Sequence, residues 1–265
     1  MANSWQGKIA LITGASSGIG AATARRLAAE RLTVVLCARR RERLEALAAE
    51  IHEGNGKAYI YPADLAQEGE RAALFRQVTI ELGLPDVLIN NAGFAYYGYT
   101  DEMTWETARG LLEVNNAAAV HLIRLALPGM IARHSGHIIN IGSISGLMPS
   151  QGNTLYAATK AFMMAFTTGL HRELGGSGVR ASIVHPGPVR TELFDVTERQ
   201  ENGQRLPAEH MAIPPEQVAG AIWSLLRWPR RYVIVPWYWG WVGIVEALFG
   251  WLMDRLGPII LRKRW

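Results

Sequence analysis

A glycine-rich turn between an apolar run and a helical segment constrains the fold of this chain more than any other feature. The run Ile9–Thr13 leads into Gly-Ala-Ser-Ser-Gly-Ile-Gly at residues 14–20, and Ala21–Glu30 has the pattern of a helix. Glycines in such a turn let backbone N–H groups approach a pyrophosphate, and the N-terminus of the following helix favours an anion. This unit predicts an α/β fold that binds a nucleotide cofactor.

Strand-like and helix-like segments alternate along most of the chain. The predicted strands are Ile9–Thr13, Thr33–Ala38, Lys57–Ala63, Asp86–Asn90, Gly136–Ile141, Val179–Val184 and Tyr232–Val235. The predicted helices are Ala21–Glu30, Arg41–Glu53, Glu68–Leu82, Trp105–Arg133, Thr154–Leu174 and Pro215–Trp228. Such alternation favours a parallel sheet covered by helices on both faces, and right-handed crossovers make it doubly wound. We therefore predict an α/β fold with a doubly wound parallel β-sheet.

The expected domain limits follow from where this alternation stops. No repeat or low-complexity linker divides residues 1–236, so we expect them to form one α/β domain. Residues from about 190 to 214 are polar and weakly periodic, which predicts an inserted lid. Residues 237–265 form a separate tail that is apolar and rich in tryptophan.

Composition excludes several classes of protein. The chain has 265 residues, of which 49% are hydrophobic and 19% charged, so it can build a large core. Cys37 is the single cysteine, which rules out an internal disulfide, and its apolar surroundings predict inert burial. The N-terminus lacks a secretory pattern, so we expect a cytoplasmic protein. The net charge of +4 suits an anionic cofactor or an anionic membrane surface, and no motif is typical of nucleic-acid binding.

A cluster of arginines follows the second predicted strand. Residues 39–43 contain four arginines and lie where a helix begins, a place that disfavours cations. An acidic residue at the strand end would bind the ribose hydroxyls of NAD, but none is present there. A 2′-phosphate would remove the electrostatic conflict through the planar donor fork of arginine. The cluster favours NADP(H) over NAD(H), with a solvated run of charges as the alternative.

Tyr156 and Lys160 lie four residues apart on a predicted helix and therefore share one face. An ammonium group beside a tyrosine lowers the pKa of the phenol, which could then exchange a proton with a carbonyl oxygen near neutral pH. The pair opens the helix after the fifth strand, at the carboxyl edge where ligands bind in such sheets. Ser143 follows that strand, and its hydroxyl can hold the substrate oxygen. We predict that Tyr156 is the catalytic acid/base.

Several motifs occur together in an order that resembles the short-chain dehydrogenase/reductase family, over residues 8 to about 236. The turn at 13–20 is similar to the family's T-G-x-x-x-G-I-G, and residues 90–93 are similar to its N-N-A-G motif. Pro186-Gly187 with Thr191 resembles the segment that binds the nicotinamide end. The resemblance implies a Rossmann fold and a catalytic set of Asn115, Ser143, Tyr156 and Lys160.

The resemblance also implies a role for each member of this set. NADPH would deliver a hydride to a carbonyl carbon while Tyr156 delivers the proton. Ser143 would polarise the carbonyl oxygen, and Lys160 would lower the pKa of Tyr156 and bind the nicotinamide ribose. Asn115 would support a proton-relay water near the lysine. Asn116 leaves a one-residue ambiguity, and we prefer Asn115 because it follows a valine.

The same resemblance implies a set of residues that bind NADP(H). Ser16 and Arg39 would contact the 2′-phosphate, with Arg40 as a weaker candidate, and Asp64 would contact the adenine ring. The expected cofactor-binding residues are Gly14, Ser16, Ser17, Gly18, Ile19, Gly20, Arg39, Arg40, Asp64, Leu65, Asn91, Ala92, Gly93, Tyr156, Lys160, Pro186, Gly187, Val189 and Thr191. No metal is implied, and the seven histidines form no ligand pattern.

Apolar side chains are frequent in the loops expected at the carboxyl edge of the sheet. These are Phe94, Tyr96, Tyr97, Tyr99, Leu147, Met148, Leu193 and Phe194. They predict a pocket for a lipophilic ketone, aldehyde or 3-oxoacyl group, although some could instead pack as ordinary core. A non-catalytic NADP(H)-binding sensor or scaffold at a membrane is the alternative function, and the complete catalytic set argues against it.

The tail carries most of the tryptophans, since seven of nine lie between Trp223 and Trp265. Val242–Leu256 is predicted to form one helix of fifteen residues, shorter than the ~20 needed to span a bilayer. On this helix, Gly243, Glu246, Gly250 and Asp254 fall in one narrow stripe. An apolar helix with tryptophan and flanking arginines suits a peripheral position at a membrane. The alternative is a contact between the subunits of a homodimer or homotetramer.

Overall fold

The computed structural model describes residues 5–205 and 207–260. Its centre is a seven-stranded parallel sheet in the order β3-β2-β1-β4-β5-β6-β7. The strands are β1 (Ile9–Thr13), β2 (Thr33–Ala38), β3 (Lys57–Pro62), β4 (Val87–Asn90), β5 (Gly136–Ile141), β6 (Val179–Pro186) and β7 (Tyr232–Val235). The order reverses between β1 and β4, which confirms the predicted doubly wound sheet.

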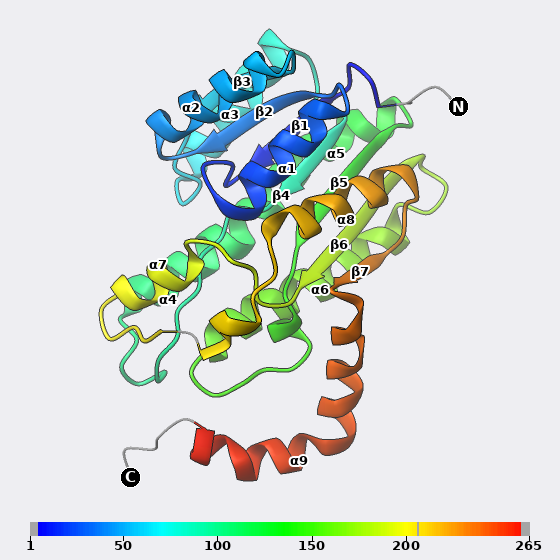
Figure 1. Ribbon diagram of the computed structural model, residues 1–265. Coiled ribbons are helices and arrows are strands. Elements are labelled where there is room, and N and C mark those ends of the chain that lie inside the picture. Colours follow the sequence, from blue (N-terminus) through cyan, green and yellow to red (C-terminus); the bar gives the residue numbers. More distant parts are fainter. Residues whose placement is uncertain (1–4, 206, 261–265) are drawn as a thin grey trace.

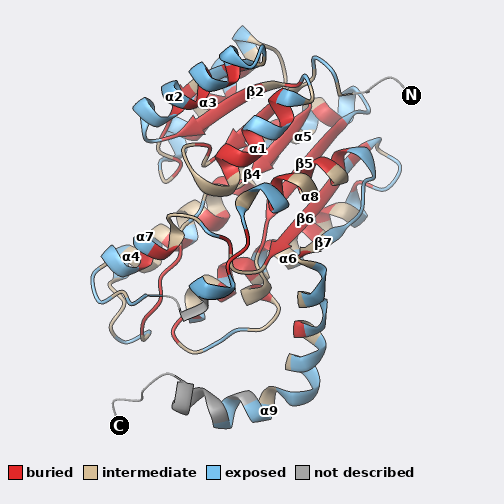
Figure 2. Ribbon diagram, in the orientation of Figure 1, coloured by how far each residue is buried: buried red, intermediate tan, exposed pale blue. Residues whose placement is uncertain are grey.

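Helices cover both faces of the sheet (Figure 1). They are α1 (Gly18–Ala29), α2 (Arg41–Glu53), α3 (Glu68–Glu81), α4 (Trp105–Leu112), α5 (Ala118–Ala132), α6 (Thr154–Glu173), α7 (Leu193–Arg199), α8 (Pro215–Arg227) and α9 (Val242–Ile260). One core cluster joins the sheet to α1, α2 and α8, and a second joins it to α3, α5 and α6. The inner strands β2, β1, β4, β5 and β6 are correspondingly buried on both faces, and the edge strands β3 and β7 are partly exposed (Figure 2). Cys37 is buried in β2, and burial raises the pKa of its thiol to about 12.

The predicted helix Trp105–Arg133 forms as one helical stretch from Trp105 to Ala132, but its interior is not regular α-helix. A π-helical turn, Glu113–Ala117, separates α4 from α5. The side chains of Asn115 and Asn116 in this turn donate hydrogen bonds to Thr159 on α6. The extra residue in the turn lets both amides reach the same neighbouring helix, which local periodicity could not indicate. Most other predicted boundaries agree with the structure to within three residues.

The segment expected to be a lid contains α7 and a short 3-10 helix, Pro207–Met211. Val189 and Ile213 form an isolated parallel bridge, so the two ends of this segment come together beside β6. Beyond β7, the 3-10 helix Trp237–Trp241 leads into α9. Helix α9 extends away from the sheet, and most of its described side chains are exposed (Figures 1 and 2). Among the helices in the described part of the chain, none is long and apolar enough to cross a bilayer.

Candidate active site

A cavity of about 1260 Å³ opens at the carboxyl edge of the sheet. Residues that follow β1, β2, β3, β4, β5 and β6 line it, together with the start of α6 and parts of the segment 190–214. Parallel strands present their carboxyl ends at one edge, so loops that are distant in sequence converge there. Of the expected cofactor and catalytic residues, only Gly20 and Asn115 are not part of its lining.

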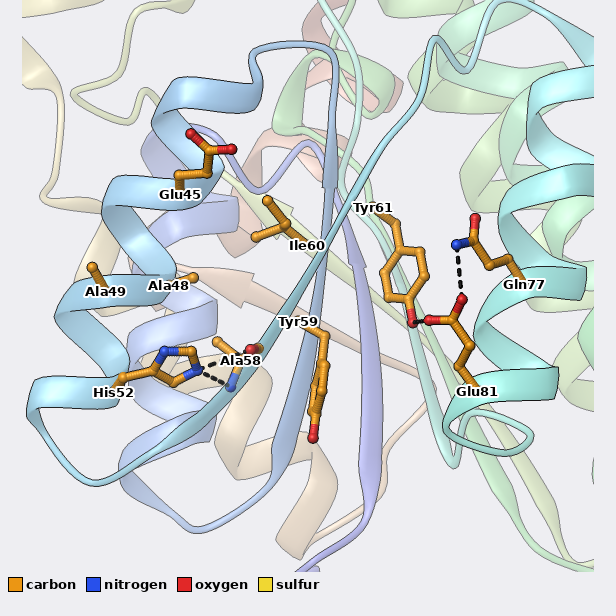
Figure 3. A pocket seen from close by; sticks show the side chains of 10 residues that line it. All are labelled: Glu45, Ala48, Ala49, His52, Ala58, Tyr59, Ile60, Tyr61, Gln77 and Glu81. Carbon is orange, nitrogen blue, oxygen red and sulfur yellow. Dashed lines mark hydrogen bonds between the residues drawn. The ribbon is translucent and has the colours of Figure 1, made fainter.

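A second, smaller hollow of about 510 Å³ lies beside α2, β3 and α3 (Figure 3). Its polar side chains are largely hydrogen-bonded to other residues that line the hollow. Tyr61 Oη donates to Glu81 at 2.6 Å, and Gln77 Nε2 donates to the same carboxylate at 2.8 Å. His52 Nε2 lies 3.0 Å from the carbonyl oxygen of Ala58. These bonds leave few groups to recognise a ligand, so we place the candidate site in the larger cavity.

The glycine turn after β1 forms a cradle that side chains would fill. Gly14 and Gly18 have φ angles of +64° and +52°, which favour glycine. A Cβ on Gly18 would lie 2.7 Å from Thr191 Cγ2, and one on Gly20 would lie 2.2 Å from the carbonyl oxygen of Gly14. The first turn of α1 contains no acidic residue, and Ser17 makes no side-chain cap. The turn therefore leaves room and backbone donors for an anionic group such as a pyrophosphate.

Thr13 and Asn91 hold this turn against the end of β4. Thr13 Oγ1 accepts hydrogen bonds from the backbone N–H groups of Asn91 at 2.9 Å and Ala92 at 3.0 Å. Asn91 Nδ2 donates to the carbonyl oxygens of Thr13 at 2.9 Å and Gly14 at 3.2 Å. Thr13 was not among the expected site residues. Its position as the last residue of the first strand, directly before the glycines, could have identified it as a site residue.

Arg40 lies at the entrance to the cradle. Its Nη2 donates to Ser16 Oγ at 3.0 Å and to Ser17 Oγ at 2.9 Å, and its Nη1 donates to Glu192 Oε2 at 2.7 Å. Arg43 also pairs with Glu192. Arg39 lines the cavity as well, but the hydrogen bonds to Ser16 come from Arg40. The structure thus puts Arg40, the weaker sequence candidate, closest to the serine expected at a 2′-phosphate.

The expected catalytic side chains meet on the other side of the cavity. The Ser143 hydroxyl is hydrogen-bonded to Tyr156, and Ser143 Oγ accepts from the backbone N–H of Ser145 at 3.1 Å. Lys160 Nζ lies 5.6 Å from the centre of the Tyr156 ring and donates to the carbonyl oxygen of Ile141 at 2.9 Å. Helix α6 supplies the tyrosine and the lysine from adjacent turns, while the segment after β5 supplies the serine.

Burial, rather than the neighbouring ammonium, controls the pKa of the tyrosine. Burial raises the pKa of Tyr156 to about 12, and the hydrogen bond from Ser143 opposes this rise. Burial also lowers the pKa of Lys160 to about 8. The sequence predicted a lowered tyrosine pKa, whereas the Lys160 ammonium is hydrogen-bonded to a backbone carbonyl and the partly buried phenol has lost much of its contact with water. The phenol is therefore protonated at neutral pH and can act as an acid.

Asn115 is buried between the segment after β4 and α6. Its amide donates to the carbonyl oxygen of Phe94 at 2.9 Å and to Thr159 Oγ1 at 3.1 Å, and its Oδ1 accepts from the Phe94 N–H at 3.0 Å. A Cβ on Gly93 would lie 2.9 Å from Asn115 Oδ1 and 3.7 Å from Lys160 Nζ. Asn115 therefore lies close to the lysine end of the site, as the resemblance implied.

His185, near the end of β6, was not predicted as a site residue. Its Nδ1 lies 3.2 Å from the carbonyl oxygen of Ser143. Burial lowers the pKa of His185 to about 4, so the ring is neutral near pH 7. A Cβ on Gly142 would approach His185 Nδ1 to 2.7 Å, so the glycine is needed for this contact. The histidine thus supports the backbone of Ser143. The only feature of the sequence that could have identified His185 as a site residue is its position directly before Pro186-Gly187.

The predicted substrate residues divide into two groups. Phe94, Tyr97, Met148, Leu193 and Phe194 line the cavity. Tyr96 is buried instead, and its hydroxyl donates to the carbonyl oxygen of Asn202 at 3.2 Å. Tyr99 and Leu147 are not part of the lining, whereas the cavity gains Trp239 from the tail. Within residues 5–205 and 207–260, no three His, Cys, Asp or Glu side chains gather as a metal-binding group.

Comparison with known proteins shows similarity to one family. The family described as short chain dehydrogenase matches residues 8–202. NADP-dependent 3-hydroxy acid dehydrogenase YdfG of Escherichia coli K12 is 34% identical over 230 residues, which cover 84% of this chain and 90% of that protein.

Two solved structures have a similar fold. A short-chain dehydrogenase from Sphingobium yanoikuyae, in complex with NADPH, has a TM-score of 0.79 and 30% identity, and the match covers 97% of each chain. The closed form of a serine dehydrogenase complexed with NADP+ has a TM-score of 0.78 and 32% identity, covering 85% of this chain and 93% of that chain.

Proposed function

The chain belongs to the short-chain dehydrogenase family, and on that premise we propose that it transfers a hydride between NADP(H) and a lipophilic carbonyl or alcohol. The chain is an oxidoreductase of this family with an NADP-type cofactor site. The observation that carries the proposal is the meeting of Ser143, Tyr156 and Lys160 in the cavity that also contains the glycine cradle. A cradle that excludes side chains fits the pyrophosphate of a dinucleotide.

We propose Tyr156 as the group that donates a proton to the carbonyl oxygen during reduction. The raised pKa keeps the proton on the phenol until negative charge develops on the substrate oxygen. Ser143 would hold the same oxygen by a hydrogen bond. Bound NADP(H) supplies or accepts the hydride. Lys160, whose pKa of about 8 leaves it largely protonated at pH 7, would provide positive charge near the tyrosine and bind the ribose.

The remaining residues of the expected set would bind and orient the cofactor. Ser16, Ser17 and Arg40 form a donor-rich site that suits a phosphate, which supports NADP(H) over NAD(H). Asp64 and Leu65 both line the cavity, and they would contact the adenine ring. Asn115 lies beside Gly93 and near Lys160, and it would influence the lysine without touching the substrate. Several relatives are named as NADP-dependent enzymes, in agreement with this assignment.

The apolar side of the cavity supports a lipophilic substrate. Phe94, Tyr97, Met148, Leu193 and Phe194 come from three separate segments, after β4, after β5 and at the start of α7, and line it together. Such a surface stabilises alkyl or aromatic groups by burying them. A 3-oxoacyl group is consistent with the relative that is named a 3-hydroxy acid dehydrogenase. We therefore propose ketones, aldehydes or 3-oxoacyl compounds with an apolar chain.

A screen of NADPH oxidation tests this proposal. We expect activity with methyl ketones from 2-butanone to 2-undecanone and with 3-oxoesters, and a higher kcat/KM for the longer chains. The same assays with NADH should give at least about tenfold lower kcat/KM, because the phosphate contacts are lost. A higher kcat/KM with xylose than with any long-chain carbonyl would contradict the lipophilic substrate. Absence of NADPH oxidation across the whole panel would contradict the proposed reaction.

We propose residues 1–236 as the catalytic domain with a lid at about 190–214, and residues 237–265 as a tail that contacts a cytoplasmic membrane surface. Exposed apolar side chains cover one broad face of α9. At about 100° per residue they span about 160° of the helix. These side chains are Ile244, Val245, Leu248, Phe249, Trp251 and Leu252. Gly243, Glu246, Gly250 and Asp254 occupy the opposite side, and Gly243 lies beside Leu147 of the body.

The chemistry of this face favours a lipid surface with anionic headgroups. Arg255 lies over the Trp251 ring at 5.6 Å, so a cation and an aromatic group share the exposed face. Arg262, Lys263 and Arg264 follow in the sequence, and no acidic residue comes after Asp254. An apolar aromatic face beside basic residues binds anionic interfaces through burial and charge together.

Flotation with vesicles of phosphatidylcholine and phosphatidylglycerol tests the membrane contact. We expect the full chain to float and the double variant Leu248→Glu, Trp251→Glu to stay in the dense fraction, because charge on the apolar face opposes insertion. Ile80→Glu is the matched control, since Ile80 is 77% exposed on α3, away from the tail. If the full chain stays in the dense fraction, the membrane contact is refuted. If the molecular mass of the full chain rises with protein concentration and that of the double variant does not, the face of α9 contacts another subunit instead.

A further inference from the structure

Trp239 is the one tryptophan of the described tail that reaches the cavity. Its neighbours in the 3-10 helix Trp237–Trp241 point to solvent, since Trp237 is 80% and Trp241 64% exposed, whereas Trp239 is half-buried. The Trp239 indole lies against Gly187, and a Cβ on that glycine would come within 2.7 Å of Trp239 Nε1. Trp239 is part of the cavity lining. The absence of a side chain at Gly187 therefore creates the place for this indole.

Residues 236–243, here called the tail root, are fixed to the body near both ends. The N–H of Gly187 donates to the carbonyl oxygen of Val235 at 2.7 Å, which joins the end of β7 to the segment after β6. At the other end, Val242 is buried, and a Cβ on Gly243 would lie 4.0 Å from Leu147 Cβ. The tail root thus runs from the segment after β6 to the segment after β5. This course holds Trp239 in place through the start of α9, while most of the described side chains after Gly243 are exposed.

The order of the strands puts Trp239 at the reacting end of the cavity. The donors expected for the adenosine half, Ser16 and Arg40, follow β1 and β2, on one side of the sheet. Ser143 follows β5, Gly187 follows β6, and Trp239 follows β7, on the other side. Trp239 therefore lies beyond Gly187 on the side where hydride transfer is expected, and far from the phosphate donors.

We propose that Trp239 is a specificity-determining residue whose indole forms a wall for the apolar part of the substrate. The inference rests on the proposed reaction and adds a residue to it from outside the segment that matches the family. Tryptophan offers a large, rigid, apolar surface at little cost in conformational entropy. A long alkyl chain packs along that surface, while a short ketone ends before reaching it. Trp239 thereby determines the preference for substrates of a given chain length and takes no part in the proton transfer.

Three variants test this wall. Trp239→Ala removes the indole, Trp239→Phe keeps an aromatic surface, and Trp237→Ala removes an equally large side chain from the same 3-10 helix outside the cavity. We expect Trp239→Ala to lower kcat/KM for 2-nonanone about tenfold, mainly through KM, and to change 2-butanone by less than about threefold. Trp239→Phe should recover most of the loss, and Trp237→Ala should match the unmodified protein.

Calorimetric titration of 2-nonanone into the complex with NADP+ gives a second readout that needs no turnover. Trp239→Ala should weaken this binding about tenfold and leave the Kd for NADPH within about twofold. If Trp239→Ala matches Trp237→Ala for every ketone in both assays, the wall is refuted while the proposed reaction stands. Equal losses for all chain lengths, or a parallel loss of NADPH affinity, would mean that Trp239 only supports the fold. Ketone binding without any NADPH oxidation would refute the reaction and leave the wall intact.

Discussion

Replacing Tyr156 with phenylalanine is expected to lower kcat about a thousandfold or more and to leave the Kd for NADPH within about twofold. The substitution removes one hydroxyl, which is the group proposed to donate the proton. The ring remains, so the packing of α6 and the position of Lys160 should change little. The Ser143 hydroxyl cannot replace the phenol, because it has no comparable acidity.

Single-turnover and steady-state assays with 2-nonanone, together with fluorescence titration of NADPH, measure the two effects separately. Tyr61→Phe is the matched control, because it removes a tyrosine hydroxyl that lies in the hollow of Figure 3 and is not part of the lining of the larger cavity. We expect the control to keep the kcat of the unmodified protein. Retention of a tenth of the activity by Tyr156→Phe would show that another group donates the proton. Binding of NADPH without turnover by the unmodified protein would instead favour the sensor or scaffold.

Replacing Arg40 with alanine is expected to raise the Kd for NADPH about 30- to 100-fold and to leave the Kd for NADH nearly unchanged. Arg40 combines a positive charge with hydrogen bonds to Ser16 and Ser17, so it orders the donors around the expected phosphate. NADH lacks the phosphate and gains nothing from these contacts. Arg39→Ala provides the comparison, with an expected loss of less than about fivefold. Equal effects of the two substitutions, or a parallel loss for NADH, would contradict this assignment.

Glu192 provides an independent check on the same site. Its carboxylate pairs with Arg40 and Arg43, and these guanidinium groups help to hold its pKa below the usual range even though burial alone would raise it. A bound 2′-phosphate would compete with this carboxylate for the same guanidinium. We therefore expect Glu192→Gln to lower the Kd for NADPH a few-fold without affecting NADH. Weaker NADPH binding by this variant would show that Glu192 supports the phosphate site rather than competing with it.

Local patterns in the sequence predicted the layers of the fold and much of the cavity. Strand and helix periods depend on neighbouring residues, so the succession of strands and helices along the chain and the position of the glycine turn could be inferred directly. The interval between Tyr156 and Lys160 is likewise a property of one helix. Ser143, Tyr156 and Lys160 lie together in the cavity, and their catalytic roles stay predictions until the substitutions are made.

Contacts between distant segments decided the rest. The position of Arg40 beside Ser16 and Ser17 involves an ion pair with Glu192, which lies 152 positions away along the chain. The brace from His185 to Ser143 joins β6 to the end of β5, and the place of Trp239 depends on Gly187.

The sequence by itself determined which helices and strands form, because hydrophobic period and helical spacing depend only on residues close together in the chain. It also determined that a glycine turn, a tyrosine and a lysine would share one edge of a parallel sheet. Only the tertiary structure gave the direction in which the pKa of that tyrosine is shifted. A neighbouring lysine predicted a lowered pKa, but burial raises it to about 12, since desolvation depends on everything packed around the phenol. The same holds for the tail, whose sequence predicted an apolar helix at a membrane or subunit contact but not that Trp239 would line the cavity.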